Sequence, residues 1–320
     1  MSTPATALTT PAWPGPPDAA LAQTLKSLEL TITRKLDGIL HGNHQGLTPG
    51  HGSEPGESRP YNVGDDVRRI DWNVTARTRE LYVRDQIADR DLEAWIAVDT
   101  SASMAFGTAL AEKRSIALGA AAAVGFLTAR SQNKVAAVLA GGPNIRSFPP
   151  RVGRDHLRSV LQAIATAPNV EGQGRTDLGQ LARDVAGRAR RRGFVCLISD
   201  FIDDPAGWRP AIGTLATRHE VLAIEIVDQR ELDLPAVGLL TVTDPATGRT
   251  REVQITEKVR QRYAEAAAAQ RERIRTELLA TGAQHVQLRT DDDWLSQLIG
   301  YVHRRRRQPG ALRAASGGQR

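Results

Sequence analysis

Cysteine and aromatic residues are scarce in this 320-residue chain. The single cysteine, Cys196, cannot form a disulfide within the chain or supply a cysteine-based zinc site. Its neighbours in residues 194–198 are apolar, which is typical of a buried strand rather than of a reactive thiol. Aromatic residues make up only 4 % of the chain, so we expect a core of Ala, Val, Leu and Ile.

Long apolar runs and a secretory signal are also lacking. The longest uncharged apolar stretch, residues 115–129, is shorter than the roughly twenty residues that cross a bilayer. No Lys or Arg precedes Lys26 and the N-terminus has no apolar core, so a signal peptide is not indicated. We therefore expect a soluble cytoplasmic protein without a membrane span.

Acidic residues are absent from the last twenty positions, which hold six arginines, four of them consecutive at 304–307. Without those six, 36 of the 42 basic residues remain against 36 acidic ones, so residues 1–300 are formally neutral. The basic pI thus belongs to a tail, and a nucleic-acid-binding face across the fold is not indicated. We expect residues 304–320 to be a solvated, disordered tail; the alternative is that this tail binds nucleic acid or an anionic membrane.

The pattern along the chain predicts an α/β fold. Residues 1–17 are rich in Pro, Thr and Ala and are expected to be disordered, and a helix is expected over 18–40. From residue 91 to 303, apolar strands alternate with helices. The expected strands are 92–98, 134–140, 145–148, 193–199, 221–227 and 285–288, and the expected helices are 109–130, 154–165, 178–192, 205–218, 257–280 and one that closes this region. Since the strands are apolar on both faces, they indicate a mainly parallel sheet with helices on both sides. Turn residues between 239–243 and 250–255 predict a β-hairpin inserted at about 232–256.

Oxygen-bearing side chains follow two of these strands and precede one helix. Asp99, Ser101 and Ser103 follow the first strand, Asp200 follows the strand 193–199, and Thr176 lies just before a helix. The carboxyl ends of parallel strands meet at one edge of the sheet, so we expect these five residues to lie together. Such oxygen ligands suit Mg²⁺, with Mn²⁺ or Ca²⁺ as other choices. The alternative for each residue is a helix N-cap.

This pattern of Asp-x-Ser-x-Ser, a distant Thr and a later Asp resembles the metal-ion-dependent adhesion site of von Willebrand factor type A domains. In that family the two serines and the threonine coordinate the metal directly, and the aspartates help directly or through water. The resemblance implies the same roles for the five residues here. It also implies a von Willebrand A-like, Rossmann-like fold for residues 91–303, preceded by an N-terminal segment over 18–90.

A second motif lies before the sheet. It reads Arg59-Pro-Tyr61-Asn-Val-Gly64-Asp65-Asp66-Val-Arg68-Arg69-Ile70-Asp71-Trp72 and continues through Thr75-Ala-Arg77 and Leu81-Tyr-Val83. It resembles the signature of domain-of-unknown-function family 58, bacterial and archaeal proteins in which this signature precedes a von Willebrand A-like domain. Many members carry an aromatic residue where this chain has Ser53-Glu-Pro-Gly-Glu-Ser58, and many are membrane-anchored.

The charges of this signature favour a compact turn. The carboxylates of Asp65 and Asp66 can accept hydrogen bonds from backbone N–H groups or from nearby arginines, and Trp72 is expected to pack inward. We expect a small lid braced on the sheet by Arg–Asp pairs. The alternative is a partner-binding surface made of Asp65, Asp66, Arg68, Arg69, Asp71, Trp72 and Arg77. The nearby His41, His44 and His51 are irregularly spaced and lack a cysteine, so a solvated loop is expected rather than a zinc site.

These features favour a non-enzymatic binding module whose metal accepts a carboxylate from a partner. The family resemblance implies a MoxR-type AAA+ ATPase as partner and an adaptor or co-chaperone role toward a client protein. The alternative is a metal-dependent hydrolase or phosphotransferase with Asp99 as nucleophile. Phosphoaspartyl enzymes need a second Asp where this chain has Ser101, and the chain has neither a phosphate-binding loop nor a His at a strand end.

Overall fold

The computed structural model describes residues 19–40, 54–61, 67, 70–87, 92–108, 111–130, 133–141, 144–168, 176–243, 247 and 249–307. The helices are α1 (Ala19–Leu40), α2 (Trp72–Thr78), α3 (Lys113–Arg130), α4 (Arg154–Ala165), α5 (Leu178–Arg188), α6 (Pro205–Arg218), α7 (Glu257–Ala280) and α8 (Trp294–Arg307), with short 3-10 helices η2 (Ala102–Ala105) and η3 (Gln229–Glu231). The strands are β1 (Glu54–Pro60), β2 (Tyr82–Ile87), β3 (Glu93–Asp99), β4 (Lys134–Gly141), β5 (Asn144–Arg151), β6 (Phe194–Ser199), β7 (Glu220–Val227), β8 (Leu239–Thr243), β9 (Thr250–Gln254) and β10 (Gln284–Arg289).

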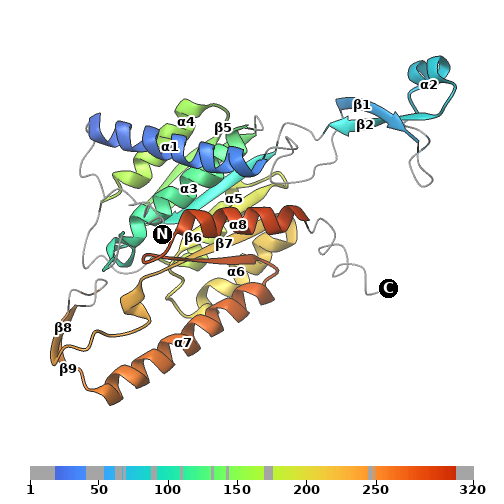
Figure 1. Ribbon diagram of the computed structural model, residues 1–320. Helices are drawn as coiled ribbons and strands as arrows, with labels where there is room; N and C mark the ends of the chain where they lie inside the picture. The colour runs from blue at the N-terminus through green and yellow to red at the C-terminus, as the bar shows by residue number, and fades with distance from the viewer. Residues whose placement is uncertain are drawn as a thin grey trace, which may run out of the picture.

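A six-stranded sheet in the order β10-β7-β6-β3-β4-β5 forms the centre of the molecule (Figure 1). Its neighbouring strands are parallel except for β4 and β5, which are antiparallel. β6 is buried along its whole length, which explains its uninterrupted apolar sequence. The predicted α/β class with a mainly parallel sheet is thereby confirmed.

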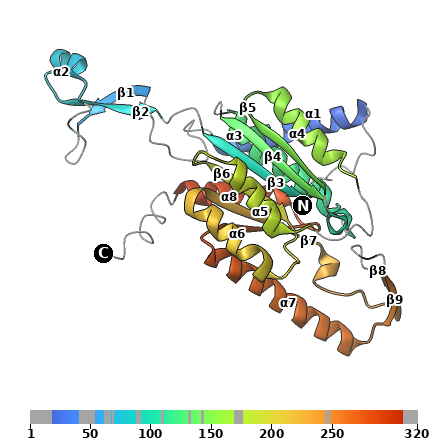
Figure 2. The same cartoon turned by 180° about the vertical axis from the view of Figure 1, so that it is seen from behind.

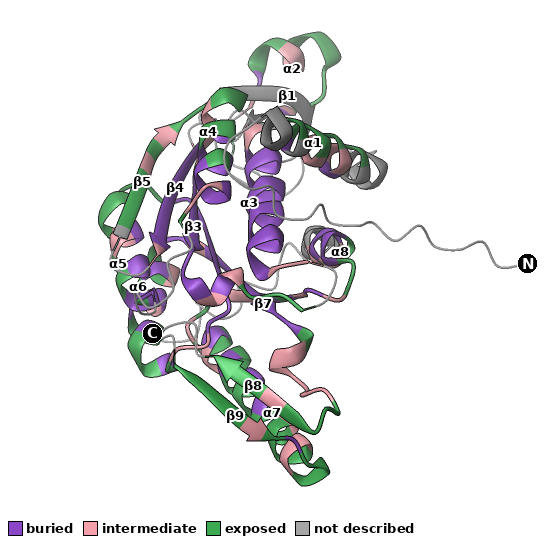
Figure 3. Ribbon diagram, turned by 90° about the vertical axis from the view of Figure 1, so that its left-hand side faces the viewer, coloured by how far each residue is buried: buried purple, intermediate pink, exposed green. Residues whose placement is uncertain are grey.

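Alternate residues of the central strands enter two separate cores. Ile96 and Val98 of β3 pack with α1, α3, α4 and α8, whereas Trp95 and Ala97 pack with α5, α6 and α7. Helices therefore cover both faces of the sheet, as Figure 2 shows from behind. Figure 3 shows the buried residues concentrated in the central strands and α3, with the hairpin β8–β9 largely exposed.

Small residues allow close packing between the helices and the sheet. The run of alanines in α3 is buried, and a Cβ on Gly119 would lie 2.4 Å from the Trp294 ring of α8. Cys196 is buried in β6, as expected, and burial raises the pKa of its thiol. A core poor in aromatic residues is thus built by letting α3 and α8 approach each other closely.

The segment before the sheet differs from the prediction. The nine glycines and prolines of residues 42–64 indicate a long loop, but residues 54–60 form β1, which pairs antiparallel with β2. The β1 sequence has two prolines, a glycine and no alternation, so only its pairing with β2 defines it as a strand. Figures 1 and 2 show β1, β2 and α2 standing to one side of the main sheet, so the expected lid braced on the sheet is wrong.

Trp72 was expected to pack inward, and this is also wrong. It begins α2 with 67 % of its surface exposed. Arg77, expected to pair with carboxylates, donates from Nε to the backbone oxygen of Asn73 one turn earlier. The aromatic ring has no core to enter because the segment lies beside the main sheet rather than over it.

Smaller differences concern the ends of the chain and of two helices. α3 begins at Lys113 rather than at residue 109, and α5 ends at Arg188 rather than at residue 192. α8 continues to Arg307, so the predicted tail boundary at residue 304 is four residues too early. Residues 1–17, His41, His44 and His51 lie outside the described residues. Within the described residues, no helix combines the length and apolar character needed to cross a membrane.

Candidate metal centre

The two aspartates lie at the ends of neighbouring parallel strands. Asp99 ends β3 and Asp200 follows β6, and β3 pairs directly with β6. The hydroxyl of Ser199 donates across the gap to Asp99 Oδ2 at 2.8 Å. Both carboxyl groups are buried, with Asp99 4 % and Asp200 2 % exposed. Strand order alone therefore places two acids side by side where little water reaches them.

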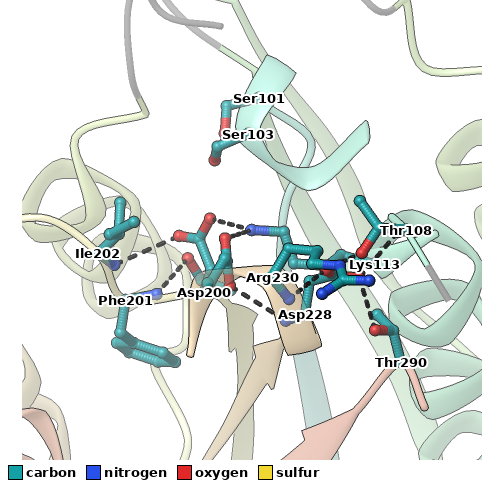
Figure 4. A network of polar contacts seen from close by, with 12 residues as sticks. Ser101, Ser103, Thr108, Lys113, Asp200, Phe201, Ile202, Asp228, Arg230 and Thr290 are labelled. Carbon is teal, nitrogen blue, oxygen red and sulfur yellow. Dashed lines mark hydrogen bonds and ion pairs between the residues drawn. The ribbon is translucent and has the colours of Figure 1, made fainter. Parts of the chain in front are cut away.

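The serines are positioned by a tight turn after β3. The backbone N–H of Ser101 donates to Asp99 Oδ1 at 2.9 Å, which fixes the start of η2. The Oγ atoms of Ser101 and Ser103 lie 3.1 Å apart. Figure 4 shows both serines above the Asp200 carboxylate, and a hydrogen bond from Ser103 is one of the influences that lower the pKa of Asp200. Because Ser101 and Ser103 are two positions apart in this turn, their hydroxyls lie close together.

Thr176 completes the group from the start of α5. Its hydroxyl donates to the backbone oxygen of Ala140 at 3.1 Å and also interacts with Asp99. The structure therefore brings together all five residues of the predicted site: Asp99, Ser101, Ser103, Thr176 and Asp200.

The alternative of helix N-caps does not hold for these residues. The N-cap of α5 is Asp177, which accepts from the N–H of Gln180, and that of α6 is Asp204. Ser101 stands at the start of η2, but its side chain makes no capping hydrogen bond. The capping positions are thus filled by neighbouring acids, and the hydroxyls of the site are left for other contacts.

Burial and nearby charges shift the pKa values of the two carboxyl groups in opposite directions. Desolvation by burial, and then repulsion by Asp200, raise the pKa of Asp99 to about 6. Burial also acts to raise the pKa of Asp200, but the Lys113 ammonium outweighs it, and the pKa of Asp200 falls below its ordinary value. The site thus holds one carboxylate that is firmly ionised and one that takes up a proton more readily.

Lys113 is a residue of the site that the sequence analysis missed. Its Nζ lies 2.8 Å from Asp200 Oδ2 and 2.5 Å from Glu231 Oε1, and the side chain is fully buried. Burial acts to lower the pKa of Lys113, but Asp200 and Glu231 raise it, so the ammonium stays charged. The available signal was a lysine in the first turn of a helix whose middle, residues 116–127, is apolar apart from two glycines.

A second set of buried charges extends from the site to α7. Arg271 Nη1 donates to the backbone oxygen of Asp200 and to Glu225 Oε1, both at 3.0 Å. Its Nη2 lies 3.3 Å from Glu231 Oε2. Glu225 also accepts from Gln287 at 3.1 Å and lies 2.8 Å from His285 Nε2. The sequence signal for this network was Glu225, a charged residue between apolar neighbours in the interior of β7.

A third carboxylate at this edge has a structural role. Asp228 follows β7 and accepts from the N–H of Thr108 at 2.9 Å and from the hydroxyl of Thr290 at 2.6 Å (Figure 4). It also caps η3 through the N–H of Arg230 at 2.9 Å. These hydrogen bonds lower the pKa of Asp228 against the opposing effect of burial. Asp228 therefore ties the loop after η2 to β7 and β10.

Phe201, the residue after Asp200, has an uncommon backbone conformation. Its φ of 51° lies in the left-handed region, which costs a bulky residue about 1–3 kcal/mol. The ring is buried and packs edge-on against Trp208 at 5.8 Å between centroids. Packing thus maintains a strained turn directly beside a residue of the site.

A comparison with protein families identifies the chain's relatives. The family model "Protein of unknown function DUF58" matches residues 57–273. The chain belongs to this family. The match spans both the signature segment and most of the sheet domain, so the resemblance seen in the sequence is confirmed.

Similar proteins include one from Mycobacterium tuberculosis, named "Uncharacterized protein Rv1480", which is 48 % identical over 295 residues and covers 92 % of both chains. Among solved structures, BatB from Bacteroides thetaiotaomicron is similar with a TM-score of 0.41 and 14 % identity, covering 68 % of this chain and 100 % of that chain. The VWA domain of SpRpn10 has a TM-score of 0.40 and 11 % identity, covering 66 % of this chain and 94 % of that chain.

The donor set fits a small, hard cation. The edge of an octahedron of oxygens around Mg²⁺ is about 3.0 Å long, since each oxygen lies about 2.1 Å from the ion. The Oγ atoms of Ser101 and Ser103 share a hydrogen bond at 3.1 Å, a separation that is also compatible with that edge. The part of the chain that the structure describes has no cluster of three His, Cys, Asp or Glu side chains suited to a metal. A divalent cation here would therefore depend on hydroxyl oxygens together with Asp99.

Proposed function

We propose that this protein is a non-enzymatic, metal-dependent protein-binding module. The observation that carries the proposal is the convergence of two carboxylates and three hydroxyls at the carboxyl edge of the sheet. Asp99, Ser101, Ser103 and Thr176 would hold Mg²⁺, or Mn²⁺ or Ca²⁺, with Asp200 beside them. When bound, the ion supplies an electrophilic position that accepts an acidic side chain of a partner.

Binding has more support than catalysis because the site lacks the acid and base that a reaction at Asp99 would need. The position where phosphoaspartyl enzymes carry their second acid is occupied by Ser101, and His285 is engaged with Glu225. The alternative of a hydrolase or phosphotransferase therefore has weaker support.

The partner that the family resemblance implies is a MoxR-type AAA+ ATPase in the cytoplasm, with this protein as its adaptor or co-chaperone toward a client. The segment of β1, β2 and α2 offers a second contact surface. Val67, Trp72 and Leu81 are 62 %, 67 % and 46 % exposed on it, and exposed apolar groups of this size commonly mark protein interfaces.

Individual residues of the signature contribute differently to this surface. Trp72 and Arg77 are exposed and suited to contact a partner. Asp71 is buried and caps α2, so its role is structural. Asp65, Asp66, Arg68 and Arg69 lie outside the described residues and remain part of the prediction.

The test is capture of the MoxR-type ATPase from the same organism by the purified protein, with Mg²⁺ or with a chelator. We expect capture with Mg²⁺ and loss of capture with chelator or with Asp99→Ala, whose folding is verified by circular dichroism. Asp155→Ala is the matched control because the Asp155 side chain on α4 is 98 % exposed. Undiminished capture by Asp99→Ala would overturn the proposal.

A further inference from the structure

The Asp200 carboxylate already has a cation beside it. Lys113 Nζ lies 2.8 Å from Asp200 Oδ2, and the N–H of Ile202 donates to Oδ1 at 3.3 Å. Figure 4 shows the lysine reaching the same carboxylate above which the two serines lie. A divalent ion that approached Asp200 would therefore meet an oxygen already engaged by a full positive charge.

The ammonium is held in this position from its other side. Glu231 Oε1 lies 2.5 Å from Lys113 Nζ. Glu231 Oε2 in turn accepts from the N–H of Asp228 at 3.1 Å and lies 3.3 Å from Arg271 Nη2. If Lys113 moved away, the buried Asp200 carboxylate would lose its cation and Glu231 would keep only Arg271, which is costly in a medium of low polarity. The lysine is thus a fixed component of the site.

We propose that Lys113 sets the metal affinity of this site by competing with a divalent cation for Asp200. The inference rests on the proposed metal-dependent function. Its ammonium repels the incoming ion and occupies one of the two carboxylates that would attract it. The free protein then binds the ion weakly because the charge of Asp200 is neutralised by Lys113. A partner's carboxylate would supply the missing negative charge.

The test measures the affinity for Mn²⁺ alone, by calorimetric titration at neutral pH. The main variant is Lys113→Met combined with Glu231→Gln, because this pair removes the ammonium and one of its counter-charges together and limits the loss of folding. We expect it to bind Mn²⁺ at least about tenfold more tightly than the wild type. Adding Asp99→Ala to this variant should abolish the gain, which would locate it at this site.

Two further variants separate charge from structure. Lys113→Arg keeps the charge and should bind Mn²⁺ no more tightly than the wild type. Lys258→Met removes an exposed lysine of α7 and should leave the affinity unchanged. The single variant Lys113→Met is followed by thermal unfolding, where Mn²⁺ should raise its Tm more than that of the wild type, since the metal replaces the lost cation.

An unchanged or weaker Mn²⁺ affinity in the double variant overturns the inference, and so does an absence of binding in both the double variant and the wild type. Failure of the proposed function would look different, because capture of the ATPase would survive Asp99→Ala. If only the role of Lys113 is wrong, capture of the ATPase will still depend on Asp99, but the removal of Lys113 will not change the affinity for Mn²⁺.

Discussion

The carboxyl edge of the main sheet and the segment of β1, β2 and α2 use their polar residues in opposite ways. At the sheet edge, Lys113, Asp200 and Glu225 are buried, and each contacts oppositely charged groups from distant parts of the chain. In the signature segment, Arg77 bonds its own helix and Trp72 faces solvent. Polar residues thus join distant parts of the chain in the first region, whereas in the second these side chains bond their own helix or face solvent.

This difference sets what a substitution should do. Removal of one member of a buried ion network leaves an uncompensated charge, so the main effect is a lower free energy of unfolding. Removal of an exposed side chain leaves folding nearly intact and changes only what the surface can bind. The comparison can therefore be tested by measuring folding and binding separately in both regions.

The largest effect on stability is expected for Arg271→Met. It leaves the fully buried Glu225 without its arginine and weakens the support of Glu231, so the free energy of unfolding should fall by about 3–5 kcal/mol. Urea unfolding measures it. Arg275→Met on the same helix is the control, since the Arg275 side chain is 52 % exposed and its removal should change the free energy of unfolding far less. Equal losses in both variants would contradict the comparison.

A pH effect of about 3 kcal/mol is expected from Asp99 in the presence of chelator. The pKa of Asp99 is raised from 3.8 to about 6, so folding favours its protonated form and the ionised form carries a penalty. This penalty is absent below pH 3.8 and complete above about pH 6. The wild type should therefore lose stability relative to Asp99→Asn as the pH rises through this window.

Unfolding by urea at several pH values between 4 and 7, in EDTA, measures this difference. Asp200 does not contribute to this pH dependence, because its lowered pKa keeps the group ionised in the folded protein throughout this pH range. A stability difference between wild type and Asp99→Asn that is independent of pH, or that grows in favour of the wild type, would show that Asp99 is not destabilised by its surroundings.

A smaller and local effect is expected for Asp71→Ala. The Asp71 carboxylate accepts from the N–H groups of Asn73 and Val74 at 3.1 and 3.3 Å, and loss of such an N-cap costs about 1 kcal/mol. Hydrogen exchange should become faster in α2 while the amides of β3 and β6 keep their protection. Faster exchange in the main sheet as well would show that the two regions are coupled.

The sequence predicted the sheet domain well because its signals are local. α6 and α7 begin at residues 205 and 257 as predicted, and the structure shows Asp204 and Thr256 capping these starts. The site residues could be found because strand ends define a common edge. Lys113 could not be assigned in the same way, since its partners lie 87 and 118 positions away in the chain. β1 and α2 were missed because one lacks a strand pattern and the other is only seven residues long.

The smallest effect on stability is expected for Trp72→Ala, whose free energy of unfolding should change by less than about 0.5 kcal/mol. Its effect on binding should be large, because an exposed tryptophan is a common anchor of protein interfaces. We expect capture of the MoxR-type ATPase to weaken at least about tenfold even with Mg²⁺ present. Leu279→Ala is the control, since Leu279 is 47 % exposed on α7, away from this segment. If Trp72→Ala captures the ATPase as well as Leu279→Ala does, the signature segment is not a contact surface and binding depends on the sheet edge.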